Sequence, residues 1–149
     1  MHKDLERARK SGKRIVLAGG VFDIIHPGHI YFLGQAKRKG DFLVVVVATK
    51  KRGKERKLIN SQEKRAEIVA SLKPVDMAVV GNSGNILDIV EELKPHLIVL
   101  GPDQKFSQTQ LEQELKGRGL KTRIWRVPKK LAGYSTTAIL KKAKKIRAL

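Results

Sequence analysis

The sequence predicts an α/β fold built on a single doubly wound parallel sheet of five strands (Rossmann-like). Apolar, strand-like runs alternate five times with amphipathic, helix-like segments, and the joins between them are short. This pattern is typical of parallel strands linked by right-handed crossovers. The unbroken apolar run at 42–47 (FLVVVV) indicates a strand that helices cover on both faces. At 149 residues we expect one domain, 1–149, whose residues 1–13 form a basic helical extension.

Helix caps and stops place the elements of the first half of the chain. Gly40 closes the helix that follows the first strand, and Ser61 is a favourable N-cap for the next helix. The expected elements are a strand at 14–20, a helix at 28–40, a strand at 41–49, a helix at 61–73 and a strand at 75–81.

The second half continues the alternation. Pro95 stops one helix, glycines end another, and Ser135 opens the last one. The expected elements are a helix at 85–95, a strand at 96–101, a helix at 109–119, a strand at 121–127 and a helix at 135–149.

The net charge of +18 is the most unusual bulk property. A positive field suits a nucleic-acid binder, but it also suits an enzyme that handles nucleoside triphosphates and pyrophosphate, so charge alone does not separate these classes. The absence of cysteine excludes disulfides and thiolate metal sites. Because no apolar run could span a membrane and the N-terminus has no apolar signal core, we expect a cytoplasmic protein with no membrane partner.

The stretch at 19–29 (GGVFDIIHPGH) joins the first strand to its helix, at the sheet edge where ligands of such folds bind. The glycines allow a ligand to approach closely. The helix should begin near Pro27 or Gly28, so its free N–H groups and positive dipole end should face the same crevice. His26 and His29 flank this helix start, where imidazole N–H groups can stabilise charge on phosphoryl oxygens. The alternative is a pair of ordinary helix-start histidines.

Other metal and phosphate motifs are absent from the sequence. A zinc site would need further ligands, and neither cysteine nor a third nearby histidine is available. The P-loop motif does not occur, and the dinucleotide fingerprint GxGxxG is missing from the first turn. These absences leave a histidine-based phosphate site as the favoured interpretation.

Two segments carry a family resemblance. GVFDIIHPGH resembles the HxGH signature of the nucleotidyltransferase superfamily, in particular its small cytidylyltransferase-like members. GYSTTAIL resembles the second, ISTT-type signature of that branch, with Tyr134 in place of the usual isoleucine. The resemblance extends from about Arg14 to Lys145. It implies that an acceptor phosphate attacks the α-phosphorus of a nucleoside triphosphate and pyrophosphate leaves, usually with a divalent metal.

The resemblance also implies roles for individual residues. His26 and His29 would be catalytic, and a lysine of the basic cluster at 50–57 would bind phosphates. Of the candidates Lys50, Lys51, Lys54 and Lys57 we favour Lys54. Arg65 would either face the phosphates or form an exposed salt bridge. The expected nucleotide-binding residues are Gly20, Val21, Phe22, His26, Pro27, Gly28, His29, Arg65, Gly101, Asp103, Gln104, Tyr134, Ser135, Thr136 and Thr137.

The stretch at 99–106 (VLGPDQKF) bears on the acceptor. Gly101 allows close approach to a base or ribose, Asp103 can accept hydrogen bonds, and Gln104 can donate and accept them, although the same residues suit an ordinary turn. GPDQ resembles the archaeal-type FAD synthases of the same superfamily, which adenylate FMN, although the cysteines that those enzymes often carry are missing here. Lys129 and Lys130 stand where the branch commonly carries an arginine.

We therefore predict transfer of the AMP moiety of ATP to FMN, giving FAD and pyrophosphate, with a divalent metal that we expect to be Mg²⁺. One alternative is a CTP-dependent cytidylyltransferase acting on glycerol 3-phosphate or another small phospho-alcohol. Another is a non-catalytic basic nucleic-acid-binding module, which the scarcity of aromatic residues disfavours. Phe106, Trp125 or Tyr134 at the crevice would favour FMN, whereas a narrow, lysine-lined crevice would favour the small acceptor. The resemblance also suggests a homodimer, whose interface no segment marks.

Overall fold

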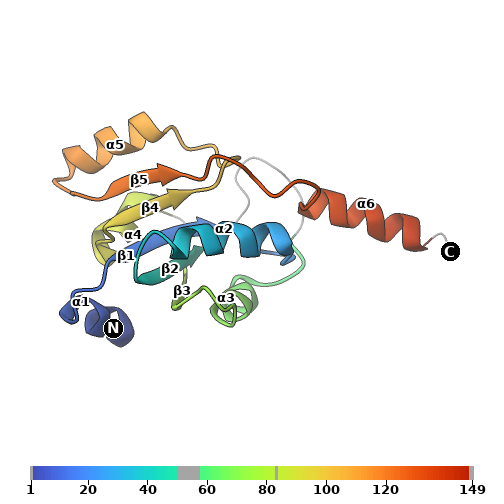
Figure 1. Cartoon of the computed structure of the whole chain (residues 1–149), viewed down its shortest axis with the longest axis horizontal. Coiled ribbons are helices and arrows are strands. Elements are labelled where there is room, and N and C mark those ends of the chain that lie inside the picture. The colour runs from blue at the N-terminus through green and yellow to red at the C-terminus, as the bar shows by residue number, and fades with distance from the viewer. Residues whose placement is uncertain (1, 50–57, 83, 148–149) are drawn as a thin grey trace.

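The computed structural model describes residues 2–49, 58–82 and 84–147, and within them five parallel strands form one sheet (Figure 1). The spatial order of the strands is β3-β2-β1-β4-β5, and every neighbouring pair is parallel. The predicted doubly wound sheet is confirmed, and its strand order reverses between β1 and β4. The strands are β1 (Ile15–Gly20), β2 (Phe42–Val47), β3 (Met77–Val80), β4 (Leu97–Leu100) and β5 (Arg123–Arg126).

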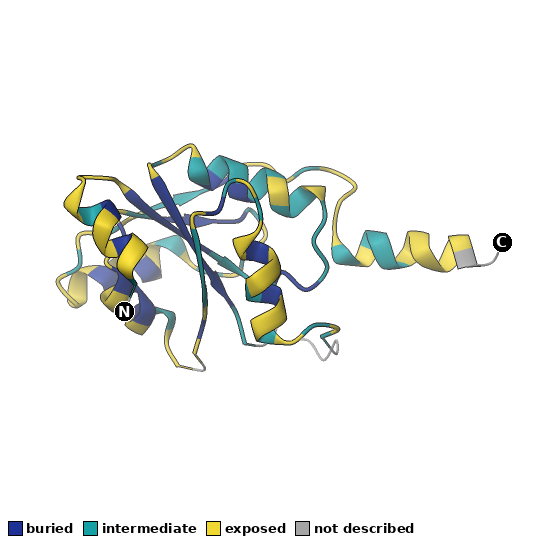
Figure 2. Cartoon of the chain, turned by 90° about the horizontal axis from the view of Figure 1, so that it is seen from below, coloured by how far each residue is buried: buried dark blue, intermediate teal, exposed yellow. Residues whose placement is uncertain are grey.

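Helices cover both faces of this sheet (Figures 1 and 2). The helices in the described residues are α1 (Lys3–Lys10), α2 (Pro27–Lys37), α3 (Gln62–Ala70), α4 (Ile86–Leu93), α5 (Gln108–Gly117) and α6 (Thr136–Arg147). Buried side chains of α2 and α3 pack on one face, and those of α1, α4 and α5 pack on the other. α6 extends away from the sheet, and much of its surface is exposed (Figure 2).

The valine-rich strand β2 shows why the sheet needs two helical layers. Phe42, Val44 and Val46 belong to the core cluster on the α4 side, whereas Leu43 and Val45 belong to the cluster on the α2 side. Alternate side chains of a strand point to opposite faces. An apolar residue at every position therefore buries both faces of the strand, as the sequence predicts.

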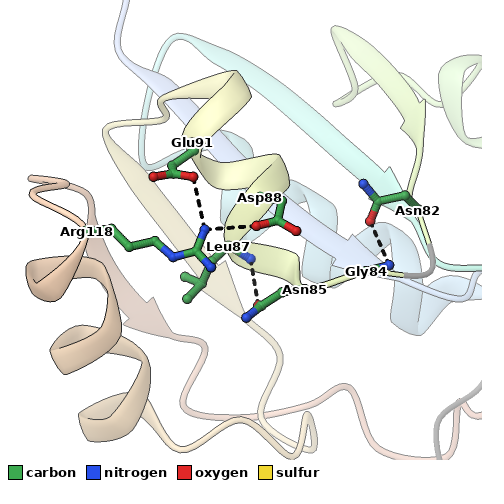
Figure 3. Close-up of polar contacts among 7 residues, drawn as sticks. All are labelled: Asn82, Gly84, Asn85, Leu87, Asp88, Glu91 and Arg118. Carbon is green, nitrogen blue, oxygen red and sulfur yellow. Dashed lines mark hydrogen bonds and ion pairs between the residues drawn. The ribbon is translucent and has the colours of Figure 1, made fainter.

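Side-chain contacts link α5 to α4, which lie on the same face of the sheet (Figure 3). The Asn85 side chain accepts the Leu87 N–H at 3.0 Å and so caps α4. The guanidinium of Arg118, just after α5, donates to the carboxylates of Asp88 at 2.9 Å and Glu91 at 3.0 Å.

Within the described residues, none of the helices combines the length and apolar character that crossing a membrane requires.

The basic N-terminal extension is part of the packed structure. Leu5 and Ala8 of α1 are 1% and 4% exposed and belong to the same core cluster as β1, β4 and α4. The Arg9 guanidinium donates to the carbonyl of Leu93 at the end of α4. We infer that residues 2–13 fold together with the sheet.

Replacement of Leu5 by alanine should lower the free energy of unfolding by about 2–5 kcal/mol, because it leaves a cavity in the core. Urea-induced unfolding, followed by circular dichroism, measures the change. Arg7→Ala is the matched control, since the Arg7 side chain is 78% exposed, and it should change stability by less than about 0.5 kcal/mol. Equal unfolding midpoints for the two variants would contradict the packing of α1 described here.

Candidate active site

A cleft of about 380 Å³ opens at the carboxyl edge of the sheet, where the strand order reverses between β1 and β4. Its walls come from the end of β1, the start of α2, the loops after β4 and β5, and the start of α6. Most of the residues that the sequence predicts for the site therefore lie together. Those that line the cleft are Gly20, Val21, Phe22, His26, Gly28, His29, Gly101, Asp103, Gln104, Tyr134, Ser135 and Thr136.

The other predicted residues lie differently. Pro27 and Thr137 belong to the first turns of α2 and α6 beside the cleft, but are not among its lining residues. Lys54 lies outside the described residues. Arg65 lies in the interior, as described below.

The two histidines form a capping box at the start of α2. The Gly28 N–H donates to Nδ1 of His26 at 3.1 Å, and the backbone N–H of His26 donates to Nδ1 of His29 at 3.3 Å. The two imidazole rings stack with their centroids 3.8 Å apart. Since both Nδ1 atoms accept hydrogen bonds, each neutral ring must carry its proton on Nε2. Each histidine thus keeps an Nε2–H donor outside the cap.

This cap corrects one expectation from the sequence, namely free backbone N–H groups at the start of α2. The N–H of His26 and that of Gly28 are taken by the imidazoles, and the His29 N–H donates to the His26 carbonyl at 3.0 Å. Pro27 has no N–H. The donors that this helix start can offer to a ligand are therefore the imidazole Nε2–H groups and not the backbone N–H groups of His26 and Gly28, which the imidazole Nδ1 atoms already accept.

Burial keeps both imidazoles neutral. It lowers the pKa of His26 below its ordinary value. Burial first, and the neighbouring His26 second, lower the pKa of His29 to about 4. At neutral pH the pair therefore presents two uncharged N–H donors.

The Phe22 ring packs against the His29 ring. Its ring is tilted by 59° against that of His29, with centroids 5.2 Å apart, and it is 3% exposed. The backbone of Phe22 has φ 53°, a left-handed conformation that costs free energy for a bulky residue. A Cβ atom at Gly20 would lie 2.9 Å from the Phe22 ring. The glycine therefore makes room for the side chain that holds His29 in place.

Gly28 brings the two sequence signatures together. A Cβ atom at this position would lie 2.8 Å from the His26 ring and 3.0 Å from the carbonyl oxygen of Tyr134. The segment before α6 can therefore approach the start of α2 only where a side chain is missing. At the start of α6, the Ser135 hydroxyl accepts the Ala138 N–H at 3.0 Å, so Ser135 is the cap and Thr136 extends the polar wall of the cleft.

Arg65 does not face the cleft as a phosphate ligand, nor does it form an exposed salt bridge. It is 1% exposed, and its guanidinium donates to backbone carbonyls at the ends of the loops after β1 and β2. The acceptors are the carbonyls of Val21, Ala48, Thr49 and Asn60, at 2.7, 2.7, 3.4 and 3.1 Å. Because α3 packs on the sheet, the Arg65 side chain reaches the loops after β1 and β2 from the interior. Arg65 therefore holds the backbone of these loops beside the cleft.

Several cleft residues were not identified from the sequence as site residues. Tyr31 and Phe32 of α2, and Leu131 after β5, add apolar walls. Tyr31 and Phe32 lie within one turn of His29, so helical spacing was the signal that could have found them. Lys129 and Lys130 also line the cleft, and Lys130 lies 3.1 Å from the Asp103 carboxylate in an exposed ion pair.

The chain is similar to known proteins over most of its length. A family model described as Cytidylyltransferase-like matches residues 17–142. A protein named FAD synthase from Archaeoglobus profundus is 48% identical over 130 residues, which cover 85% of this chain and 84% of that relative. An FAD synthase from Ferroglobus placidus is 47% identical over 113 residues, covering 75% and 74%.

A solved structure is similar as well. It is described as the lipopolysaccharide core biosynthesis protein from Thermoplasma volcanium, and it is 39% identical with a TM-score of 0.76. The match covers 80% of this chain and 99% of that chain. The names of the relatives therefore agree between the two curated proteins and differ for the solved structure.

Gly28→Ala and Gly34→Ala should have opposite effects, although both positions lie in α2. Gly28→Ala forces the His26 ring and Tyr134 apart and should destabilise the protein by about 1–3 kcal/mol. Gly34→Ala meets no atom within 4 Å and should stabilise it by about 0.5–1 kcal/mol. Thermal unfolding measures both changes. A neutral or stabilising Gly28→Ala would contradict the close approach of the two signatures.

The pKa of His29 should lie near 4 in the folded protein, against about 6.5 in the unfolded chain. Between these pH values the unfolded state binds more protons, so this histidine makes stability rise with pH and weakens the fold on acidification. NMR titration of the imidazole measures the pKa directly. His29→Gln should remove this part of the pH dependence of unfolding. Titration of His29 near its ordinary pKa would exclude the buried neutral pair.

Proposed function

The chain belongs to the cytidylyltransferase-like family, and we propose that it is an FAD synthase that transfers the AMP moiety of ATP to FMN. The observation that carries this proposal is the similarity to curated FAD synthases over most of the chain. The cleft supports it, because a capped histidine pair, a hydroxyl-bearing helix start and apolar walls meet in one place.

The polar wall of the cleft is suited to a triphosphate. The Nε2–H groups of His26 and His29 can donate to phosphoryl oxygens, and Ser135 and Thr136 offer hydroxyls in the same cleft. The first-turn amides of α6 other than that of Ala138, which Ser135 caps, add donors, because such groups have no intrahelical partners. Lys129 and Lys130 add positive charge where relatives of this branch commonly carry an arginine.

The reaction needs no nucleophilic side chain, because the acceptor brings its own phosphate. An oxygen of the FMN phosphate forms a bond to the α-phosphorus of ATP, and the bond from that phosphorus to the bridging oxygen of the β-phosphate breaks. Pyrophosphate takes the bonding electrons and leaves. Negative charge rises on the oxygens around the α-phosphorus, where neutral imidazole N–H donors stabilise it without moving a proton.

The apolar walls favour a planar aromatic ring. Tyr31, Phe32, Leu131 and Tyr134 line the cleft, and such surfaces pack well against adenine or flavin rings. Of the aromatic residues whose position we used as a criterion for FMN, Tyr134 is at the cleft, whereas Phe106 and Trp125 are not among its lining residues.

We further propose that Mg²⁺ accompanies the triphosphate. Among the described residues, no group of three or more histidine, aspartate or glutamate side chains gathers in a way that could hold a metal ion. The cleft nevertheless offers oxygen donors, including the Asp103 carboxylate and the Ser135 hydroxyl, which would suit a hard cation such as Mg²⁺. When bound, the ion would neutralise charge on the phosphates. The grip of Lys54 on the phosphates and a homodimeric state are also proposals, and both come from the resemblance.

One observation favours a second candidate function. Lys129 and Lys130 make one side of the cleft basic, which also suits a CTP-dependent transfer to glycerol 3-phosphate or another small phospho-alcohol. The different name of the Thermoplasma relative adds a reason to test the acceptor directly.

Purified protein with ATP, FMN and Mg²⁺ should form FAD, and His29→Ala should lower kcat by about 10²–10³-fold, the effect of losing one transition-state donor. Chromatography of the flavins measures FAD, and pyrophosphate release is measured in parallel. His2→Ala is the matched control, because His2 lies outside the cleft, and it should leave kcat unchanged.

The same assay should also be run with ATP and CTP against FMN, glycerol 3-phosphate, phosphocholine and phosphoethanolamine. Pyrophosphate release with CTP and a phospho-alcohol, without FAD formation from ATP and FMN, would establish the second candidate. If neither His26→Ala nor His29→Ala changes turnover, the histidine pair is not catalytic.

A further inference from the structure

The hydrogen-bonded ladder between β1 and β4 ends below the cleft. β1 stays paired with β2 up to Gly20, which lies opposite Val47, but its pairing with β4 runs only to Ala18, opposite Val99. The next residues of β1 and β4 therefore part, and the cleft opens between them. Parting strands leave backbone N–H and C=O groups without their ladder partners, and such groups need others.

The side-chain amide of Gln104 forms hydrogen bonds with both parted segments. Its Nε2 donates to the carbonyl of Gly19 at 2.7 Å, and its Oε1 accepts the N–H of Gly101 at 2.9 Å. Gly19 is the next residue of β1 after the last ladder position, and Gly101 follows β4 directly. A side-chain amide thus bridges the two strands across the opening.

The loop that carries Gln104 is itself fixed. The guanidinium of Arg126, at the end of β5, donates to the carbonyls of Gly101 at 2.8 Å and Gln104 at 2.9 Å. It also donates to the carbonyl of Phe106. Arg126 thus holds the backbone of Gln104 in place. We call the bridge that the Gln104 amide makes between Gly19 and Gly101 the brace.

We propose that Gln104 is a positioning residue that sets the width of the cleft between β1 and β4, and that it does not read the nucleotide. The residues after β1 hold the histidine pair, whereas the loop after β4 carries Asp103. The brace therefore fixes the distance between the segment that holds the histidine pair and the loop that carries Asp103. This inference rests on the proposed function for its kinetic test, and it revises the expectation that Gln104 contacts the nucleotide.

Gln62 offers a matched control. Its Nε2 donates to the carbonyls of Val47 at 2.9 Å and Gly81 at 2.7 Å, so its side-chain amide also bridges two neighbouring strand ends, those of β2 and β3, through two donated hydrogen bonds. It is not among the residues that line the cleft. Loss of the Gln62 amide should therefore weaken the sheet edge without changing the width of the cleft.

Gln104→Met keeps the length of the side chain and removes both hydrogen bonds. It should lower kcat/KM for FAD formation by about 10–100-fold, mainly through kcat, because small displacements of reacting groups are costly. Gln62→Met should lose a similar amount of thermal stability and leave kcat/KM within about twofold of the wild type. Equal kinetic losses in the two variants, or none in Gln104→Met, would overturn the proposal.

Gln104→Glu adds a pH-dependent test. An ionised glutamate can accept the Gly101 N–H, but it repels the Gly19 carbonyl. A protonated glutamate can accept from Gly101 and donate its O–H to Gly19, as the amide does. The ratio of variant to wild-type kcat/KM should therefore rise as the pH falls from about 8 to 5.5, the range in which partial burial places a raised glutamate pKa. A ratio that does not change with pH would contradict the brace.

Amide hydrogen exchange separates this inference from the proposed function, because it requires no turnover. The Gly101 N–H should exchange faster in Gln104→Met than in the wild type, and at the wild-type rate in Gln62→Met. If the wild type forms no FAD, the proposed function fails while the exchange still tests the brace. Unchanged exchange at Gly101 in Gln104→Met would overturn the brace even in an active enzyme.

Discussion

The structure depends on the separation of β1 from β4 at the carboxyl edge of the sheet. In a doubly wound sheet the crossovers leave the central strands in opposite directions, so no connection fills the space above them. β1 ends its pairing with β4 at Ala18 and continues with β2 alone. The cleft, the histidine pair and the loop after β4 all occupy the space that this separation creates.

Separation leaves backbone carbonyls that a ladder would otherwise satisfy, and polar side chains take over that role. Arg65 and Arg126 each donate to several carbonyls, one on either side of the cleft. The amides of Gln62 and Gln104 bridge neighbouring strand ends. Because an unsatisfied buried carbonyl costs more free energy than a typical hydrogen bond contributes, these side chains keep the cleft open without loss of stability.

Two unfavourable arrangements in the cleft hold the histidine rings in place. Phe22 adopts a left-handed backbone conformation, and two imidazoles are desolvated so that the pKa of each is lowered. The packed sheet beneath holds both arrangements in place. The result is a pair of neutral imidazoles whose Nδ1 atoms accept backbone N–H groups while their Nε2–H groups remain as donors that can stabilise phosphoryl charge.

The sequence by itself determined the order of strands and helices, because apolar periodicity and caps are local properties, and it identified the signatures that meet in the cleft. It did not show that Leu5 joins the core, that imidazoles replace the α2 amides, or that Arg65 and Gln104 turn toward backbone carbonyls. Whether a polar side chain such as that of Gln104 forms hydrogen bonds with a ligand or with the backbone depends on the distance between the loops at the strand ends. That distance is set by strand pairing between residues remote in the chain, so only the tertiary structure decided it.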